Sequence, residues 1–449
     1  MGEEPANTAQ KFDDLVEVTY GPLFATPTRE RRDGKLLATQ WEYVWSIRKC
    51  GFDGWNSSKG NSGTFEGKMP KNRKIIERSA CFFAPVSDPG ALERVKFYAD
   101  DLQVLRGLFK RVHVCTRWRD LKIDVSIIFV WWWTWAFVPV MLGRLLGIPV
   151  VITGTFNFRH KNPSSVAQRD YFHRPAWQRA LIRLSVLGAT ANIFVSENET
   201  RQVSNHFGIN NGYFVPHGVD CLTYRRGHRE REPFILNVAW TEKANAIRKG
   251  LPEIIEAFEI VARTNSLVRL VLAGKPGDYD LVLKAMAHEL GINERVLFLG
   301  EVSERTKIDL LQTCMLYVQP SRYEGFGLAL AEAMACGCPV IVSREGAIPE
   351  LVATAGEYID SINPASIAGT IAELIESEEK RDELSRLATK RIAEVFSLER
   401  RVSGIRRIIL SAIGSSPTPR SKRLSLRCIN RHQHFFGVVR LDGKRHRNT

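Results

Sequence analysis

The stretch Pro320–Met334 of this 449-residue chain reads PSRYEGFGLALAEAM. The apolar run Met315–Ser321 predicts a strand, and Leu328–Cys336 predicts a helix that begins directly after a loop with two glycines. Gly325 and Gly327 let the backbone come close to a ligand, because neither carries a Cβ. The free N–H groups and the positive end of the helix dipole would point at that loop, which favours a phosphate.

Two carboxylates flank this loop, Glu324 before the helix and Glu332 inside it. Eight positions span at most about 12 Å if they are helical throughout, which is about the length of a sugar diphosphate. One carboxylate could then hold sugar hydroxyls while the other holds a ribose. Solvated acids are also common at helix starts, so the spacing alone leaves both interpretations open.

The second half of the chain alternates strands and helices around this segment. Strands are predicted over Phe234–Trp240, Arg269–Gly274, Arg295–Gly300, Met315–Ser321 and Pro339–Ser343. Helices are predicted over Leu251–Thr264, Tyr279–Gly291, Glu304–Thr313, Leu328–Cys336, Pro364–Glu376, Glu379–Val395 and Leu398–Ile413. Such alternation indicates parallel strands in an α/β domain.

The first half repeats the pattern less regularly. Strands are predicted over Ala80–Pro85, Arg111–Thr116, Val125–Val130, Ile148–Thr153 and Ala191–Ser196. Helices are predicted over Arg94–Phe109, Phe137–Leu146 and Pro175–Leu187, and Val215–Gly218 reads as a linker. Ligands bind beyond the carboxyl ends of parallel strands, so two such halves that face each other would form a binding cleft.

These patterns divide the chain into five parts. We expect an N-terminal extension with a flexible loop (1–79), two Rossmann-like domains (80–218 and 219–397), a C-terminal helix (398–414) and a basic tail (415–449). Hydrophobic residues make up 44% and charged residues 25%, which excludes a mostly disordered chain and a multi-span membrane protein.

The net charge of +14 is concentrated in the tail. Residues 415–449 hold nine basic residues and one acid, so the tail carries +8 and the other 414 residues only +6. A nucleic-acid-binding protein is therefore disfavoured. The tail is either a solvated, disordered end or a peripheral contact with an anionic membrane, in which Phe435 and Phe436 would insert shallowly.

One segment raises the question of a membrane span. Val125–Leu142 contains no charge, but its tryptophans lie in the middle and Pro139 interrupts it, so a strand, a loop and a short helix are favoured. Eight scattered cysteines without a CxxC pair favour a reducing compartment. The first residues show neither a basic start nor an apolar core, so we expect a cytoplasmic protein, with the inner face of the membrane as its peripheral contact.

The sequence SRYEGFGLALAEAMACGCPVIVSREGAIPELV strongly resembles the donor-site segment of retaining GT-B glycosyltransferases, the family 4 or "group 1" type. The Glu324–Glu332 pair, the GFG loop, the CPVIVS strand and the GAIPELV turn carry the resemblance together, which extends over residues 234–395. Weaker similarities run through the first half, including VPHGVD at the linker. The resemblance implies a GT-B fold, with two facing Rossmann-like domains and a cleft between them.

The resemblance also implies roles for individual residues. Glu332 would bind the ribose of a nucleotide, and Glu324 would face the donor sugar. Gly325 belongs to the same donor-binding loop, and the backbone N–H groups of Phe326, Gly327 and Leu328 would contact the diphosphate.

Two further donor contacts are implied outside this loop. Lys249 matches a basic residue of the family that neutralises the diphosphate. Gly90 lies in the loop that would face the phosphates from the first domain, although an ordinary turn fits its sequence as well.

The chain departs from the family pattern at two places. An arginine common in the family after the first strand of the second domain is replaced by Ala239-Trp240, and Arg248 is a candidate substitute. A histidine common on the acceptor side is missing after Thr153, and His160 is a candidate that comes seven residues later. These departures concern the rate and the acceptor site more than the donor site.

The resulting expectation is an enzyme that moves a sugar from a nucleotide-sugar donor to an unknown acceptor, lipid-linked or polysaccharide, with retention of configuration. Fixed positive groups would stabilise the departing diphosphate, so we expect no metal and no cofactor. Three alternatives remain: a nucleotide-sugar epimerase or phosphorylase on the same fold, a catalytically impaired sugar-nucleotide-binding partner protein, and, least favoured, a nucleic-acid-binding protein.

Overall fold

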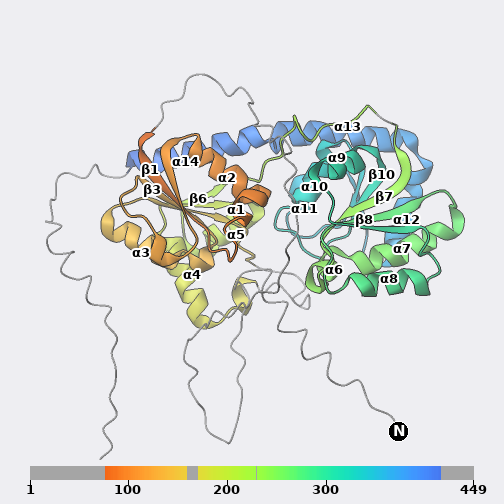
Figure 1. Ribbon diagram of the computed structural model, residues 1–449, viewed down its shortest axis with the longest axis horizontal. Helices are drawn as coiled ribbons and strands as arrows, with labels where there is room; N and C mark the ends of the chain where they lie inside the picture. The colour runs from red at the N-terminus through yellow and green to blue at the C-terminus, as the bar shows by residue number, and fades with distance from the viewer. Residues whose placement is uncertain (1–75, 159–169, 229, 416–449) are drawn as a thin grey trace, which may run out of the picture.

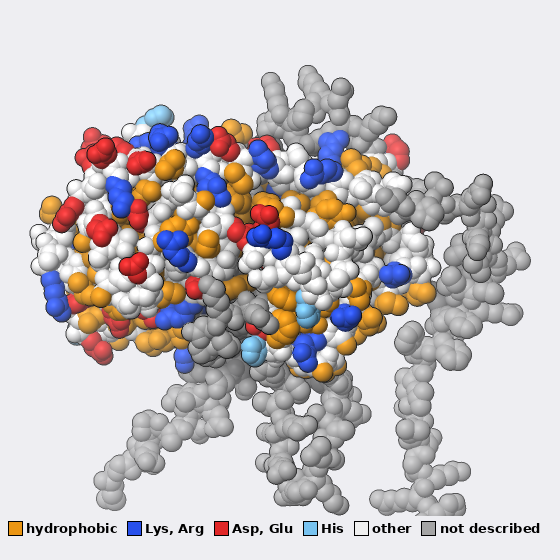
Figure 2. All heavy atoms as spheres, turned by 180° about the vertical axis from the view of Figure 1, so that it is seen from behind, with side chains coloured by type: hydrophobic (Ala, Val, Ile, Leu, Met, Phe, Trp, Pro, Cys, Tyr) orange, Lys and Arg blue, Asp and Glu red, His pale blue; other side chains and the backbone are white. Residues whose placement is uncertain are grey.

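The computed structural model describes residues 76–158, 170–228 and 230–415, which form two α/β domains side by side (Figure 1). Each domain contains one six-stranded sheet in which all neighbouring strands are parallel, so the predicted fold class is confirmed. Most of the extension, His160 and the tail from residue 416 lie outside the described residues. Seen from behind, acidic and basic side chains intermingle over the second domain, whereas hydrophobic side chains gather at the lower end of the first (Figure 2).

The first sheet has the strand order β2-β1-β3-β4-β5-β6. Its strands are β1 (Ile76–Phe83), β2 (Phe109–Cys115), β3 (Ile127–Trp131), β4 (Val150–Gly154), β5 (Ala191–Phe194) and β6 (Gly212–Phe214). The helices between them are α1 (Ala91–Arg94), α2 (Lys96–Arg106), α3 (Phe137–Leu146), α4 (Ala176–Gly188) and α5 (Glu197–Phe207). Strands β3, β4 and β5 are buried along their whole length, as expected for the centre of a sheet covered on both faces.

The second sheet has the strand order β12-β11-β10-β7-β8-β9. Its strands are β7 (Glu232–Val238), β8 (Arg269–Ala273), β9 (Val296–Gly300), β10 (Cys314–Gln319), β11 (Val340–Val342) and β12 (Glu357–Tyr358). The helices are α6 (Lys243–Lys249), α7 (Leu251–Thr264), α8 (Asp280–Glu289), α9 (Glu304–Thr313), α10 (Leu328–Ala335), α11 (Ile348–Val352), α12 (Pro364–Glu376) and α13 (Glu378–Val395).

The strand order of the second sheet indicates the edge at which a ligand would bind. The chain proceeds from β7 outward to β8 and β9, and then returns to the other side of β7 with β10 and β11. The loops that follow β7 and β10 therefore diverge at the point where the order reverses, which is where open parallel sheets leave a crevice. The loop after β7 leads to α6 and Lys249, and the loop after β10 carries Glu324.

The last helix, α14 (Leu398–Ser415), leaves the second domain and packs on the first (Figure 1). Ile405, Ile408 and Ile409 are buried in the same hydrophobic core as α2 and β1. The buried Arg401 guanidinium pairs with both carboxylate oxygens of Asp101, each at 2.8 Å, and donates to the linker carbonyl of Val215 at 3.1 Å. This helix therefore ties the interdomain linker to the first domain.

Several boundaries differ from the sequence expectation. β1 begins at Ile76, four residues before the expected start of the first domain at residue 80. The helix expected over Arg94–Phe109 is the shorter α2, because Val95 is extended (ψ 112°) and separates α2 from α1, which precedes the expected range except for Arg94.

Besides α1, the helices α5, α6 and α11 were not expected. α5 buries few residues of its mostly polar sequence, and α6 and α11 are short helices inside segments that read as loops. Within the described ranges, no helix is both long and apolar enough to cross a membrane.

Candidate active site

The loop from Pro320 to Gly327 connects β10 to α10 at the binding edge of the second sheet. Gly327 occupies the N-cap of α10 with a φ of 97°, a left-handed conformation that favours glycine. Gly346 has a φ of 62°, and a Cβ there would lie 2.2 Å from the Glu324 carbonyl oxygen. The Ala347 N–H donates to the same oxygen at 2.8 Å, so the turn before α11 fixes the position of Glu324.

Glu324 lies at the centre of a buried cluster of charges. Its Oε1 atom is 2.6 Å from Nζ of Lys249 and 2.9 Å from Nη1 of Arg248, and it accepts a hydrogen bond from the Ser321 hydroxyl at 3.1 Å. Burial disfavours the charged carboxylate, but the two cations outweigh this effect and lower the pKa of Glu324 to about 2. Two cations and one carboxylate therefore share a site from which water is largely excluded.

The two basic residues come from the last turn of α6. Lys249 is 7% exposed, and burial lowers its pKa although Glu324 acts in the opposite direction. Arg248 also donates to the Tyr323 carbonyl at 2.8 Å and to Asn245 at 2.6 Å. Because one carboxylate faces two cations, the cluster keeps an excess positive charge that an anionic ligand can compensate.

Glu332 lies about one turn into α10 and forms a second charged cluster. Its Oε2 atom is 2.9 Å from Nζ of Lys307 on α9, which lies over the ring of Tyr224. Burial raises the pKa of Glu332 despite this partner, whereas Glu332 and Glu304 outweigh burial and raise the pKa of Lys307. Nζ of Lys307 is also 3.1 Å from Oε2 of Glu304, so Lys307 is held between two carboxylates. The Tyr224 hydroxyl donates to Glu304 and fixes its position.

The first domain contacts this loop directly. A Cβ on Gly325 would lie 2.1 Å from Cγ2 of Thr155, which follows β4, so only glycine fits at this contact. The ring of Phe326 packs edge-on against His217 of the linker, with centroids 5.3 Å apart. His217 also stacks on Trp131 of β3, and burial lowers its pKa, so the ring is neutral in this apolar setting.

Glu350 on α11 provides a polar contact between the domains. Its carboxylate accepts hydrogen bonds from the Ser196 hydroxyl at 2.8 Å and from the N–H groups of Glu197 and Asn198 at 2.7 and 3.0 Å. These groups form the N-terminus of α5, whose positive dipole end favours a carboxylate. Glu350 therefore links the turn behind Glu324 to the first domain.

The structure brings together most of the residues singled out from the sequence. Glu324, Lys249 and Arg248 are in direct contact, and Glu332 follows on α10. Gly325, Phe326, Gly327 and Leu328 form the loop and the start of α10 between the two glutamates. Gly90 lies at the N-cap of α1 in the loop after β1, where its N–H donates to Asp88 at 2.8 Å.

Other residues of the site were not identified from the sequence. Lys307 and His217 come from separate elements, and no local pattern marks them as neighbours of the loop, whereas the GAIPELV turn places Glu350 near the nucleotide. His217 lies in VPHGVD, so the motif resemblance was the one signal that could have identified it.

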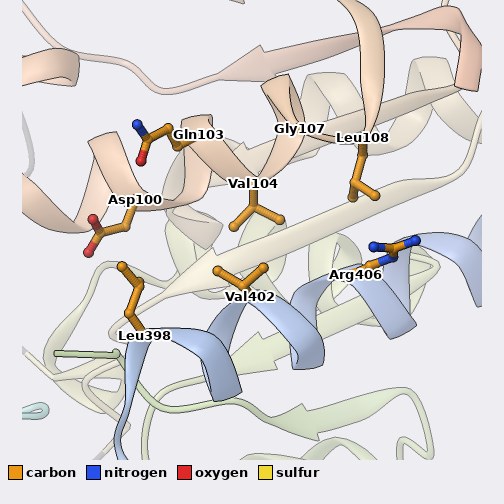
Figure 3. Close-up of a pocket in the computed structure, with 8 residues that line it drawn as sticks. All are labelled: Asp100, Gln103, Val104, Gly107, Leu108, Leu398, Val402 and Arg406. Atoms are coloured by element: carbon orange, nitrogen blue, oxygen red, sulfur yellow. The ribbon is translucent and has the colours of Figure 1, made fainter. Parts of the chain in front are cut away.

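A separate small cavity lies between α2 and α14 of the first domain (Figure 3). Its volume is about 80 Å³, and Asp100, Val104 and Leu108 face Leu398 and Val402 across it. Pockets for drug-sized ligands occupy roughly 300–1,000 Å³, so this cavity is too small for a nucleotide sugar. We therefore assign the candidate site to the clusters around Glu324 and Glu332 and not to this cavity.

Comparison with known proteins relates this site to a family. Residues 225–391 match the family model described as "Glycosyl transferases group 1". An uncharacterized glycosyltransferase of Methanocaldococcus jannaschii is 32% identical over 36% of this chain and 47% of its own length. A D-inositol 3-phosphate glycosyltransferase of Mycolicibacterium smegmatis is 31% identical over 41% of this chain and 44% of its own. The chain thus spans about half the length of these curated relatives.

Solved structures share the fold over a larger part of the chain. HepE from Anabaena, described in complex with UDP, has a TM-score of 0.60 at 17% identity and covers 74% of this chain and 100% of its own. A sucrose-phosphate synthase from Thermosynechococcus elongatus has a TM-score of 0.59 at 15% identity, covering 76% of this chain and 100% of its own. At these identities the likeness concerns the fold alone.

Proposed function

Because residues 225–391 match the model of the group 1 glycosyltransferases and the two domains form a GT-B fold, we propose that this protein transfers a sugar from a nucleotide-diphosphate donor to an acceptor hydroxyl, with retention of configuration. The cluster of Glu324, Lys249 and Arg248 carries the proposal. It places two cations and a carboxylate beside the N-terminus of α10, at the edge where parallel sheets bind ligands.

The proposed chemistry follows from the charges at this edge. When the bond between the anomeric carbon and the diphosphate oxygen breaks, the electron pair leaves with the diphosphate. The acceptor oxygen forms the new bond to carbon, and the proton of the acceptor hydroxyl passes to an oxygen of the departing diphosphate. Lys249, Arg248 and the first N–H groups of α10 would stabilise the charge that develops on the leaving group. These groups would perform in this chain the task that a divalent metal performs elsewhere, so we propose transfer without a metal.

The two carboxylates have different proposed tasks. Glu324 keeps its negative charge at neutral pH and would hold donor-sugar hydroxyls while compensating one of the two cations. Glu332 would accept hydrogen bonds from the ribose hydroxyls, with Lys307 fixing its orientation at 2.9 Å. The backbone N–H groups of Phe326, Gly327 and Leu328 would hold the diphosphate between the two carboxylates.

The acceptor would approach from the first domain. Thr155 and the linker residue His217 lie on that side of the loop. The donor side would therefore come from the second domain and the acceptor side from the first domain and the linker. We propose a glycan or a lipid-linked alcohol as the acceptor class.

A screen of donors tests the proposal. Thermal stabilisation and turnover are measured with UDP-, GDP-, ADP- and dTDP-sugars without added metal, starting with UDP-sugars because the similar HepE is described in complex with UDP-glucose. We expect one nucleotide to stabilise the protein and Glu332→Ala to lose that stabilisation. Glu301→Ala removes an exposed glutamate from the loop after β9 and should behave as the parent protein.

Two outcomes would contradict the proposal. The absence of stabilisation by every donor would mean that the glutamate clusters do not bind a nucleotide sugar. Conversion of a donor to its epimer, or phosphate-dependent cleavage, would identify a different reaction at the same site, as would a product of inverted configuration by NMR.

A further inference from the structure

The outward faces of α3 and α4 in the first domain are apolar, although both helices lie on the surface. On α4, Ile182, Ser185 and Val186 point into the core, while Trp177, Leu184 and Leu187 are 58%, 48% and 40% exposed. At 100° per residue these three side chains project opposite the buried face. Surface helices usually carry polar residues on that side, so α4 has a second apolar face without a partner among the described residues.

α3 shows the same arrangement. Pro139, Val140 and Gly143 are buried, whereas Met141 is 38% exposed and Leu145 is 76% exposed. Met141 and Leu145 are four residues apart and so lie on one side of the helix.

The two helices pack against each other. A Cβ on Gly188 at the end of α4 would lie 2.6 Å from Cγ1 of Val140 and 3.5 Å from Cδ of Arg144, so the end of α4 packs on the middle of α3. Leu184 and Leu187 lie within about one turn of Gly188, and Met141 and Leu145 lie within one turn of Arg144. We call the surface made by Trp177, Leu184, Leu187, Met141, Leu145 and Arg144 the α3–α4 face.

The charged side chains of these two helices have one sign. α3 contributes Arg144 and α4 contributes Arg179 and Arg183, and neither helix contains an aspartate or a glutamate. In the view from behind, hydrophobic and basic side chains gather at this end of the first domain (Figure 2). An apolar face with tryptophan, leucine and arginine is the composition of helices that lie in a membrane interface.

We propose that the α3–α4 face docks on a lipid bilayer that contains anionic lipids. The leucines, Met141 and Trp177 enter the boundary between headgroups and acyl chains, and the arginines contact lipid phosphates. α3 has 10 residues and α4 has 13, which is too short to span a bilayer, so the two helices lie in its plane.

A second copy of the chain fits this face less well. Two α3–α4 faces in a two-fold dimer would place arginines near arginines with no carboxylate from either helix to compensate them. Anionic phosphates supply that compensation. The inference does not depend on the proposed function, because membrane binding is measured without turnover.

Vesicle flotation of the full chain tests the proposal. Vesicles consist of phosphatidylcholine alone or of equal parts of phosphatidylcholine and phosphatidylglycerol. We expect binding to the mixed vesicles, a loss of about tenfold or more for Trp177→Ser with Leu184→Ser and Leu187→Ser, and a loss of about 30-fold for Arg144→Gln with Arg183→Gln. The control pair Leu267→Ser and Leu281→Ser removes leucines that are 75% and 77% exposed on the second domain, and should bind as the parent chain.

Three results would overturn the proposal. Unchanged binding of the α3–α4 variants would assign any lipid affinity to another part of the chain, such as the basic tail. An equal loss in the control pair would show a general effect of removing exposed leucines. Sedimentation velocity without lipid would reveal a second copy as the occupant, if the parent chain is dimeric and the α3–α4 variants are monomeric. Circular dichroism and thermal unfolding of each variant identify any that fail to fold.

Discussion

Glu324 is the residue on which the second domain's site depends, because it is the carboxylate that both Lys249 and Arg248 contact. Glu324→Gln would leave two cations close together and largely buried without their anion. Removing one partner of a buried ion pair typically costs about 3–5 kcal/mol, so we expect the free energy of unfolding to fall by that amount in urea titration. A nucleoside diphosphate would supply new negative charge, and it should stabilise this variant more than the parent protein.

The control for this prediction is Glu301→Gln, which removes an exposed carboxylate from the same domain and should change stability by less than about 0.5 kcal/mol. If Glu324→Gln unfolds at the same urea concentration as the parent, the two cations are not held by this carboxylate. If it unfolds earlier but transfers sugar at the parental rate, the proposed role of Glu324 at the donor is wrong.

The lowered pKa of Glu324 predicts a dependence of stability on pH. Its pKa is about 2 in the folded protein, against 4.5 for an ordinary glutamate. A depressed carboxyl pKa stabilises the fold above the unfolded value and loses this contribution as pH falls through the folded value; here it amounts to about 3 kcal/mol. We expect the stability difference between the parent and Glu324→Gln to be constant at neutral pH and to narrow below about pH 4.5. Urea titrations at several pH values measure it, and a constant difference down to about pH 3 would contradict it.

At the scale of elements, α14 explains how the linker is fixed. Arg401 is 1% exposed and Asp101 is fully buried, so neither charge can find water if the other is removed. We expect Arg401→Met to lower the free energy of unfolding by about 3–5 kcal/mol. The double variant Arg401→Met with Asp101→Leu should recover part of that loss, because no buried charge then lacks a partner. A double variant as unstable as the sum of both single variants would show that packing, and not charge, holds α14 in place.

The same helix shows what the sequence can predict about this fold and what it cannot. The bounds of α7, α9 and α12 agree with the sequence expectation, because each helix alternates a buried apolar face with a polar one and α9 and α12 begin at side-chain caps. The sequence also predicts a helix from Leu398, but its apolar face does not specify which domain it covers. α5 was missed because Val203 and Phe207 are the two hydrophobic residues that it buries.

The candidate site also combines residues that the sequence predicts with contacts that only the structure shows. Glu324 and Glu332 follow from a motif within one segment, since the motif itself fixes their distance along the chain. Lys307 comes from α9 and Glu350 from α11, and their contacts depend on strand order and on the contact between domains. Local sequence patterns contain no information on these contacts, so Lys307 and the interdomain hydrogen bonds of Glu350 required the structure.

At the scale of the whole molecule, the two domains meet in a closed arrangement. Gly325 touches Thr155, Phe326 touches His217, and the Glu350 carboxylate caps the N-terminus of α5. Glu324 and Glu332 are 6% and 4% exposed, and we expect the domains to move apart when a nucleotide sugar enters. Glu350 would resist that movement, because its three hydrogen bonds all cross the interface.

We therefore expect Glu350→Gln to favour the open arrangement. A neutral amide interacts less favourably than a carboxylate with a helix N-terminus, by roughly 0.3–2 kcal/mol, and it can accept fewer of the three hydrogen bonds. This difference would shift a two-state equilibrium by up to about 30-fold. Small-angle X-ray scattering should then show a larger radius of gyration without ligand, and a bound nucleotide should reduce it toward the parental value. Glu376→Gln, at an exposed position of α12, is the matched control, and an unchanged scattering profile for Glu350→Gln would mean that the apolar contacts of Phe326 with His217 suffice to keep the domains together.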